Sequence, residues 1–356
     1  MVVFEDTLSV RLQAYAAEFF EVLMVGSLES PSDVDGLSGA APDAAPAAAL
    51  AAAAPTLSFG AAAPAQPPAE ACARDVAVLL ALWDADDEFK WHFGGGADPW
   101  AWHGVGARDG RVTTLDLSGC SPWTAMPEAI GQLEALTTLK LGDENLTALP
   151  GAICRLSALT TLSLSYCKSL TSLPVAMGGL VALTTLDLRD CEDLTALPVA
   201  AIGRLAELTT LHLGGCVNLT ALPQTIGRLV ALTTLNLRDC ISLTALPQTI
   251  GRLAALTALD LRDSRSLTAL PQTIGRLAAL TTLNLRCCKS LTALPQTIGR
   301  LAALTALDLS CCESLTSLPG RAAPSSSVRA HERLFLKTPD DVFGHVLAFW
   351  RSDRDY

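Results

Sequence analysis

Aromatic residues are scarce in this sequence: they make up 5% of its 356 residues, although half of the chain is hydrophobic. The apolar residues are therefore mainly leucine and alanine, which is typical of a regular stacked core. Basic residues are also few, with 25 Lys and Arg against 36 Asp and Glu. This balance disfavours nucleic-acid binding, because neutralising phosphates requires a basic surface.

The acidic excess lies in residues 1–110, which hold 16 acidic and 4 basic residues, whereas residues 111–319 hold 15 of each. No segment approaches the roughly 18 apolar residues that span a bilayer. The N-terminal stretch carries acidic residues from Glu5 onward and lacks the positive start of a signal peptide. We therefore expect no membrane span and a cytoplasmic location, with the nucleus as an open alternative.

Motifs for catalysis and metal binding are missing as well. The sequence contains no C-x-x-C, H-E-x-x-H, G-x-S-x-G or P-loop lysine motif. We predict no enzymatic activity, no metal and no cofactor. Seven of the eleven cysteines recur at one position of a repeat, which favours buried structural thiols over a zinc site. These are Cys120, Cys167, Cys191, Cys216, Cys240, Cys288 and Cys312.

The sequence does contain an internal repeat. The eleven residues LTALPQTIGRL begin at Leu219 and return every 24 residues. In each unit the segment TTLNL alternates, so Leu235 and Leu237 face one way and Asn236 the other, as in a short strand. After the proline, IGRLAAL is spaced to pack a helical or extended turn back over the leucines. The strands are expected to begin at Leu115, Leu139, Leu162, Leu186, Leu211, Leu235, Leu259, Leu283 and Leu307.

A unit of 24 residues cannot enclose its own leucines, so the units must stack and place their strands in one parallel sheet. The unit at Leu139 is one residue short, and the unit at Leu186 has an extra alanine near Ala200. Both changes fall in loops and are expected to bend the stack only locally.

The pattern LxxLxLxxCxxLTxLPxxIGxL resembles leucine-rich repeats, in the 24-residue form of plant disease-resistance proteins and Ras-pathway scaffold-like proteins. The resemblance implies an α/β solenoid that is curved, with the parallel sheet on its concave face. The segment that begins DVAVLL and ends GRVTTLDL is similar to the N-terminal cap of plant-type members. Trp100 and Ala107 stand where that cap has its cysteine pair, so its disulfide is absent.

The composition divides the chain into six expected parts. These are an amphipathic helix over 1–30, an Ala/Pro-rich disordered linker over 31–69, the cap over 70–114, about nine leucine-rich repeats over 115–319, a linker over 320–331 and a C-terminal helix over 332–356 that caps the last repeat.

The resemblance implies a protein-binding surface on the outward strand positions and beside them. We expect the site to include Asp187, Arg189, His212, Val217, Asn236, Arg238, Ile241, Asp260, Arg262 and Asn284. Val217 and Ile241 form a small apolar island between charged neighbours, at the position that varies most between units. The expected function is a scaffold or recognition module for a protein partner, monomeric in isolation, in signalling or defence.

Two alternatives stay open. The C-terminal TPDDVFGHVLAFWR is faintly similar to the start of an F-box-like helix, which would make the chain a substrate adaptor for ubiquitin ligation. A secreted or membrane-associated receptor would instead be glycosylated at the sequons of Asn145 or Asn218. Co-purification of ligase core subunits would favour the first alternative, and attached glycans would favour the second.

Overall fold

The computed structural model describes residues 69–84, 98–119 and 124–316. The strands are β1 Val105–Arg108, β2 Arg111–Ser118, β3 Thr138–Gly142, β4 Thr161–Ser163, β5 Thr185–Asp187, β6 Thr210–His212, β7 Thr234–Asn236, β8 Ala258–Asp260, β9 Thr282–Asn284 and β10 Ala306–Asp308. The helices are α2 Ala69–Asp84, the short α4 Val199–Ile202 and the 3-10 helices η1 Pro99–Ala101, η2 Glu128–Gln132, η3 Gly151–Arg155, η4 Val175–Gly179, η5 Gln224–Arg228, η6 Gln248–Arg252, η7 Gln272–Arg276 and η8 Gln296–Arg300.

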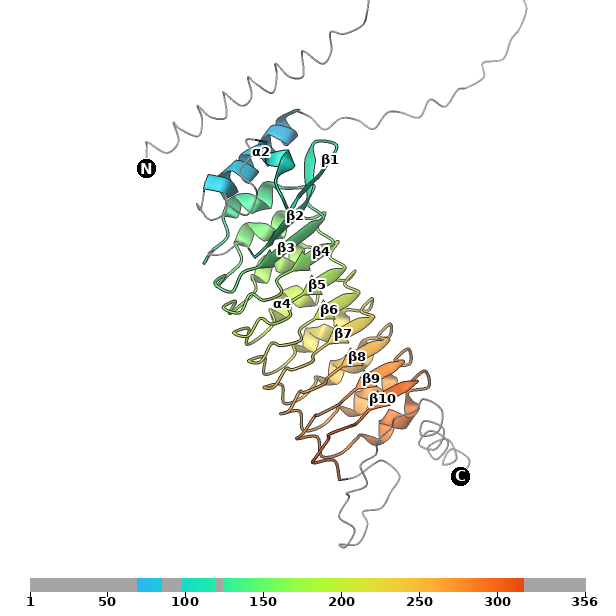
Figure 1. Cartoon of the computed structure of the whole chain (residues 1–356). Coiled ribbons are helices and arrows are strands. Elements are labelled where there is room, and N and C mark those ends of the chain that lie inside the picture. Colours follow the sequence, from blue (N-terminus) through green and yellow to red (C-terminus); the bar gives the residue numbers. More distant parts are fainter. Residues whose placement is uncertain (1–68, 85–97, 120–123, 317–356) are drawn as a thin grey trace, which may run out of the picture. The chain divides into compact units, whose positions relative to one another are not determined.

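The strands form one open sheet in chain order, as Figure 1 shows. From β2 to β10 they are parallel, and the first leucine of each strand lies beside the first leucine of the next, as Leu211 does beside Leu235. The 24-residue spacing thus predicted the register correctly. It did so because the side-chain period of a strand is two, and a slip by one residue would expose every leucine.

The nine strands expected from the repeats, β2 to β10, are all parallel, and the structure adds one strand, β1, before them. β1 pairs with β2 in antiparallel fashion, and Arg108 lies opposite Arg111. Only Asp109 and Gly110 connect the two strands, and both have positive φ, 53° and 69°. An Asp-Gly pair with this backbone makes the tight turn that favours a hairpin. That signal lies in the sequence, and it was overlooked because the segment was considered only as a cap.

The segment after the proline of each unit is helical. Seven units use a 3-10 helix of five residues, and the helix from each unit stacks on the next. The unit with the extra alanine differs: its turn is the α-helical α4, and the amide of Ile202 donates to the carbonyl of Pro198. One additional residue turns the tighter 3-10 turn into an α turn, so the insertion is absorbed locally.

The core lies between the sheet and these helices. The strand leucines and the helix isoleucines are almost completely buried, for example Leu235, Leu237 and Ile250. Threonine hydroxyls link the units before each strand: Thr257 donates to the carbonyl oxygen of Thr233 at 3.1 Å. Equivalent bonds recur from Thr137 to Thr305 at 2.9 to 3.1 Å. Threonine stands there because its hydroxyl bonds to the unit before it.

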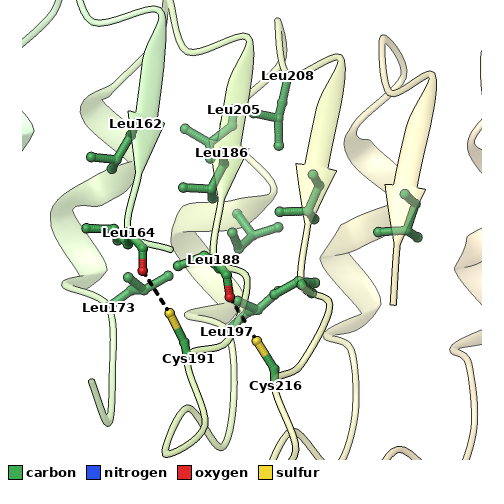
Figure 2. Packing of buried hydrophobic residues seen from close by; sticks show 14 of the residues in the cluster. Leu162, Leu164, Leu173, Leu186, Leu188, Cys191, Leu197, Leu205, Leu208 and Cys216 are labelled. Carbon is green, nitrogen blue, oxygen red and sulfur yellow. Dashed lines mark hydrogen bonds between the residues drawn. The ribbon is translucent and has the colours of Figure 1, made fainter. Parts of the chain in front are cut away.

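The described repeat cysteines form a ladder of thiols, which are buried except at the partly buried Cys312. Each thiol donates to the carbonyl of a leucine in the preceding unit, as Cys191 and Cys216 do to Leu164 and Leu188 at 3.2 and 3.1 Å in Figure 2. Ser264 takes this place in one unit and donates to the carbonyl of Leu237 at 2.9 Å. The ten cysteines within the described residues are all free thiols. The expectation of structural thiols is met at these positions.

Helix α2 and strand β2 are joined by a buried ion pair before the first repeat. Asp75 is completely buried and accepts from the guanidinium of Arg111 at 2.8 Å and from the amide of Val112 at 2.9 Å. Leu79 and Leu82 of α2 belong to the same core as the leucines of the array. Removing one partner of such a pair leaves a buried charge, which costs about 3–5 kcal/mol.

Several expected parts lie outside the described residues. They are the N-terminal helix at 1–30, nearly all of the linker at 31–69, the linker at 320–331, the C-terminal helix at 332–356 and the ladder position Cys120.

Candidate functional site

The outward strand positions form one continuous line across the sheet, which we call the sheet-face row. Its members are Asp116, Lys140, Ser163, Asp187, His212, Asn236, Asp260, Asn284 and Asp308, each beside the next. Leucines on either side of each member fix its position, and they are buried except beside Asp308, where Leu307 and Leu309 are partly buried. The array therefore presents nine polar side chains of five kinds on a sheet whose backbone is held by hydrogen bonds.

Two arginines beside this row hold carboxylates of their own strand. Arg189 binds Asp187, and Arg262 binds Asp260, with the shortest N–O distance 2.6 Å in each pair. Both bonds use Nε and a terminal nitrogen, so each arginine covers its aspartate with a planar fork. Asp187 is 7% exposed as a result.

At these two units the arginine thus pairs with an aspartate of its own strand and not with a carboxylate of a neighbouring strand. Alternate residues of a strand point to the same face, so Asp187 and Arg189 are closer partners than residues on neighbouring strands. Arg238 behaves differently, because Asn rather than Asp precedes it by two residues. It pairs with Asp239, the next residue, at 3.0 Å.

His212 lies at the centre of the row, between Asp187 and Asn236. It is half-buried, and its Nδ1 atom is buried without a hydrogen-bond partner among the described residues. Burial lowers the pKa of His212; nearby Asp187 opposes this shift and nearby Arg189 adds to it. The ring is therefore neutral at pH 7.

A second line, the turn row, runs along the turns that follow the ladder position. Its members are Glu144, Lys168, Glu192, Val217, Ile241, Arg265, Lys289 and Glu313. Ion pairs join members near its two ends: Lys168 to Glu144 at 2.6 Å, and Lys289 to Glu313 at 3.0 Å.

Between these charged ends lie Val217 and Ile241. The amide of Ser242 donates to the carbonyl of Val217 at 3.2 Å, which places the two turns side by side. Val217 is half-buried and Ile241 is 41% exposed. The structure thus brings the two residues of the expected apolar island together.

The sequence analysis did not predict the left-handed backbone conformation of the residue just before the ladder position. Asp190, Asp239 and Asp263 have φ near 57° there, and Tyr166 has φ of 67° with 58% of its surface exposed. Aspartate tolerates this left-handed conformation better than most residues, which explains its recurrence. Asp239 thus serves the turn and also pairs with Arg238.

Cys287 and Cys311 occupy this same position in adjacent units, also with positive φ. The amide of Cys287 donates to the carbonyl of Ser310 at 2.8 Å. Burial raises the pKa of Cys287, and its hydrogen bond with Cys311 raises it further. Across the described residues, no three His, Cys, Asp or Glu side chains are grouped to hold a metal ion.

Comparison with known families identifies the array. A model described as a leucine-rich repeat region matches residues 114–213 and 180–314, together more than half of the chain. The chain belongs to the leucine-rich repeat family. Proteins built from these repeats generally act as protein-interaction modules, and the repeat fold serves in general as a non-enzymatic scaffold.

Solved structures of other leucine-rich repeat proteins are similar to parts of the chain. A leucine-rich repeat protein from Leptospira interrogans is 30% identical to this chain. The match covers 58% of this chain and 56% of that protein, with a TM-score of 0.43. The repeat domain of the type III effector XopL is 28% identical, with 52% of this chain and 73% of that one covered and a TM-score of 0.41. A protein from Bacteroides thetaiotaomicron is 16% identical, with 68% and 43% covered and a TM-score of 0.49.

The chain thus spans 56% of the Leptospira protein's length and 43% of the Bacteroides protein's length. None of the curated proteins compared with the chain matches it. The helices that the structure describes include none with the length and apolar character required to cross a bilayer.

Proposed function

We propose that the chain is a recognition module that binds a protein partner on its sheet face, centred on β5 to β9. One observation carries the proposal: the sheet-face row presents a fixed series of different polar side chains at its centre. Asp187, His212, Asn236 and Asp260 are neighbours there, and two of them are held by arginine forks. Groups held in place before binding lose less conformational entropy when a partner binds.

The charge of the centre also suits a protein surface. Arg189, Arg238 and Arg262 are each paired with a carboxylate, and Arg189, Arg238 and Arg286 are exposed to solvent. Ile241 adds an apolar contact at the edge of this surface. Mixed polar contacts around a small apolar patch are common at protein interfaces.

A partner recovered by affinity purification provides the test. Its dissociation constant is measured for the wild type and for two variants, His212, Asn236 and Asp260 all to Ala, and Val217 with Ile241 to Glu. The matched control replaces the exposed Gln224, Gln248 and Gln272 with Ala on the opposite side of the array. We expect each site variant to weaken binding at least about tenfold, or about 1.4 kcal/mol, and the control to bind as the wild type.

Thermal unfolding is measured in parallel, so that loss of binding is separated from loss of structure. If both site variants remain folded and keep the affinity of the wild type, the partner binds elsewhere.

We further propose that the repeats are of the 24-residue type found in plant disease-resistance and Ras-scaffold-like proteins, with residues 70–114 as their N-terminal cap. The spacing between the strand leucines and the Asp75–Arg111 pair before the array support this. A cytoplasmic location, a monomeric state and a role in signalling or defence stay predictions from the sequence.

A further inference from the structure

Five consecutive units carry an arginine on the side of the array opposite the sheet, and we call this line the arginine row. Its members are Arg204, Arg228, Arg252, Arg276 and Arg300. All five are exposed, and four of them end the helices η5 to η8. Among the ion pairs of the described residues, none involves any of the five.

The units hold this row in a constant register. The hydroxyl of Thr249 donates to the carbonyl of Gln224 at 2.7 Å, and the same bond recurs at 2.6 Å in each of the next two units. The helices approach closely as well, because a Cβ atom added to Gly227 would lie 2.5 Å from the carbonyl oxygen of Thr249. The arginines therefore follow one another once per unit, and their step is at least the spacing of about 4.8 Å between strands of the sheet, because the sheet lies on the concave side.

Acidic residues are missing from this side of the later units. The stretches 217–233, 241–257, 265–281 and 289–305 contain no Asp or Glu, although the whole chain has a net charge of -11. The acids of these units lie in the strands and in the turns beside them. From Arg228 to Arg300 the arginine row is thus a cationic surface without carboxylates beside it in those stretches, whereas Arg204 has the exposed Glu207 three residues further along the chain.

The spacing of the row selects among anionic ligands. Five arginines separated by four steps of at least about 4.8 Å span at least about 19 Å. Carboxylates at positions i, i+4, i+7, i+11 and i+14 of an α-helix span about 21 Å, since each residue adds about 1.5 Å. Alternate residues of an extended strand would span about 27 Å, which is too long. The helix fits, because flexible arginine side chains can take up the difference of about 2 Å.

The neighbours of the row favour a helix over a single-stranded nucleic acid. Small apolar side chains follow each arginine by two residues, and Val230, Ala254 and Ala278 are exposed there. They leave room for a helix to approach. Residues 219–305 contain no Phe, Tyr or Trp, so this surface offers no aromatic ring on which bases could stack.

We infer that the arginine row is a second binding surface, which holds an acidic α-helical segment of another protein. Each guanidinium binds a carboxylate from one turn of that helix, and this geometry is one that arginine favours. The inference does not depend on binding at the sheet face, because the two surfaces lie on opposite sides of the array and share no residue.

The probe is a synthetic helical peptide with glutamates at i, i+4, i+7, i+11 and i+14 and with alanine and glutamine elsewhere. Binding to the full chain is measured by fluorescence anisotropy at low and at physiological salt. The test variant changes Arg228, Arg252 and Arg276 to Gln, and the matched control changes Arg238, Arg262 and Arg286 on the sheet face to Gln. We expect the test variant to weaken binding about tenfold and the control to change it less than twofold.

Two further ligands complete the design. A peptide of the same composition with its glutamates spread around the helix is expected to bind more weakly, and added salt to weaken the aligned peptide. If both peptides bind equally well, or if both variants lose binding equally, the attraction is unspecific and electrostatic, and the inference is overturned. Tighter binding of a 20-base-pair DNA duplex than of the aligned peptide would overturn it in favour of a phosphate backbone. Weakened partner binding in the sheet-face variants would bear only on the proposed function.

Discussion

Replacing Ser264 with alanine tests whether the hydrogen bonds that the ladder position donates to leucine carbonyls of the preceding unit stabilise the array. Ser264 is completely buried, and its hydroxyl lies 2.9 Å from the carbonyl oxygen of Leu237. Without that hydroxyl, the carbonyl keeps only a long bond of 3.4 Å from the amide of Cys240. Leaving a buried acceptor poorly satisfied costs about 1–3 kcal/mol. We expect Ser264→Ala to lower the free energy of unfolding by about 2 kcal/mol.

Ser264→Cys is the matched control, because it restores the residue found in neighbouring units. The thiols of Cys240 and Cys288 lie 3.2 and 3.1 Å from their carbonyls, so the larger sulfur needs only a small shift. We expect this variant to stay within about 1 kcal/mol of the wild type.

Urea unfolding monitored by circular dichroism gives the free energies and the slopes of the transitions. Hydrogen exchange of the amides in 237–267 shows whether the loss is local, since repeat arrays can unfold in parts. The reasoning is refuted if the alanine variant is as stable as the wild type, or if the cysteine variant is destabilised as much as the alanine variant.

Three other predictions follow from the same structure. Gly227→Ala is expected to lower the free energy of unfolding in urea by about 1–3 kcal/mol, because its methyl group would meet Thr249. Gly151→Ala is expected to be neutral, because no atom lies within 4 Å of the added methyl group. Equal stability of the two variants would contradict this reasoning. Burial raises the pKa of Cys216 to about 12, so only about one Cys216 thiol in ten thousand is ionised at pH 8. Iodoacetamide should therefore modify Cys216 in the folded chain far more slowly than the exposed Cys311, which mass spectrometry would measure. Folding lowers the pKa of His212, so the unfolded chain binds the proton more readily and the free energy of unfolding should fall as pH drops below about 6.5. His212→Asn should reduce that fall in unfolding measured from pH 7 to 5. An identical pH profile of the variant and the wild type would exclude His212 as its cause.

The register of the sheet was predictable because a single rule determines it. Leucines spaced 24 residues apart must share a buried face, so Leu211 lies beside Leu235 once the strands are parallel. The apolar island was predictable for the same reason, since Val217 and Ile241 occupy equal positions in adjacent units. Both predictions needed only the length of the unit.

The form of the turn after the proline could not be derived from the apolar pattern. A segment as short as QTIGR fits a 3-10 turn or an extended turn with the same residues buried. The bond from Thr249 to Gln224 joins helices of neighbouring units, although η3 and η4 form the same 3-10 turn without such a threonine. The pairing of Arg189 with Asp187 was likewise out of reach, because it depends on the side-chain conformation of an arginine that several acids could attract.

The two faces of the array follow from different kinds of repetition. Along the sheet-face row the residue changes from unit to unit, and a varied series is what distinguishes one protein surface from another. Along the arginine row the residue is the same in five units, so the row cannot distinguish between partners whose side chains differ from one position to the next. It suits a ligand that repeats its charge at a similar step, as an acidic helix does. Duplication of a single unit explains why the arginine row is so regular. The same duplication leaves specificity to the few positions that have since changed, and these lie on and beside the sheet.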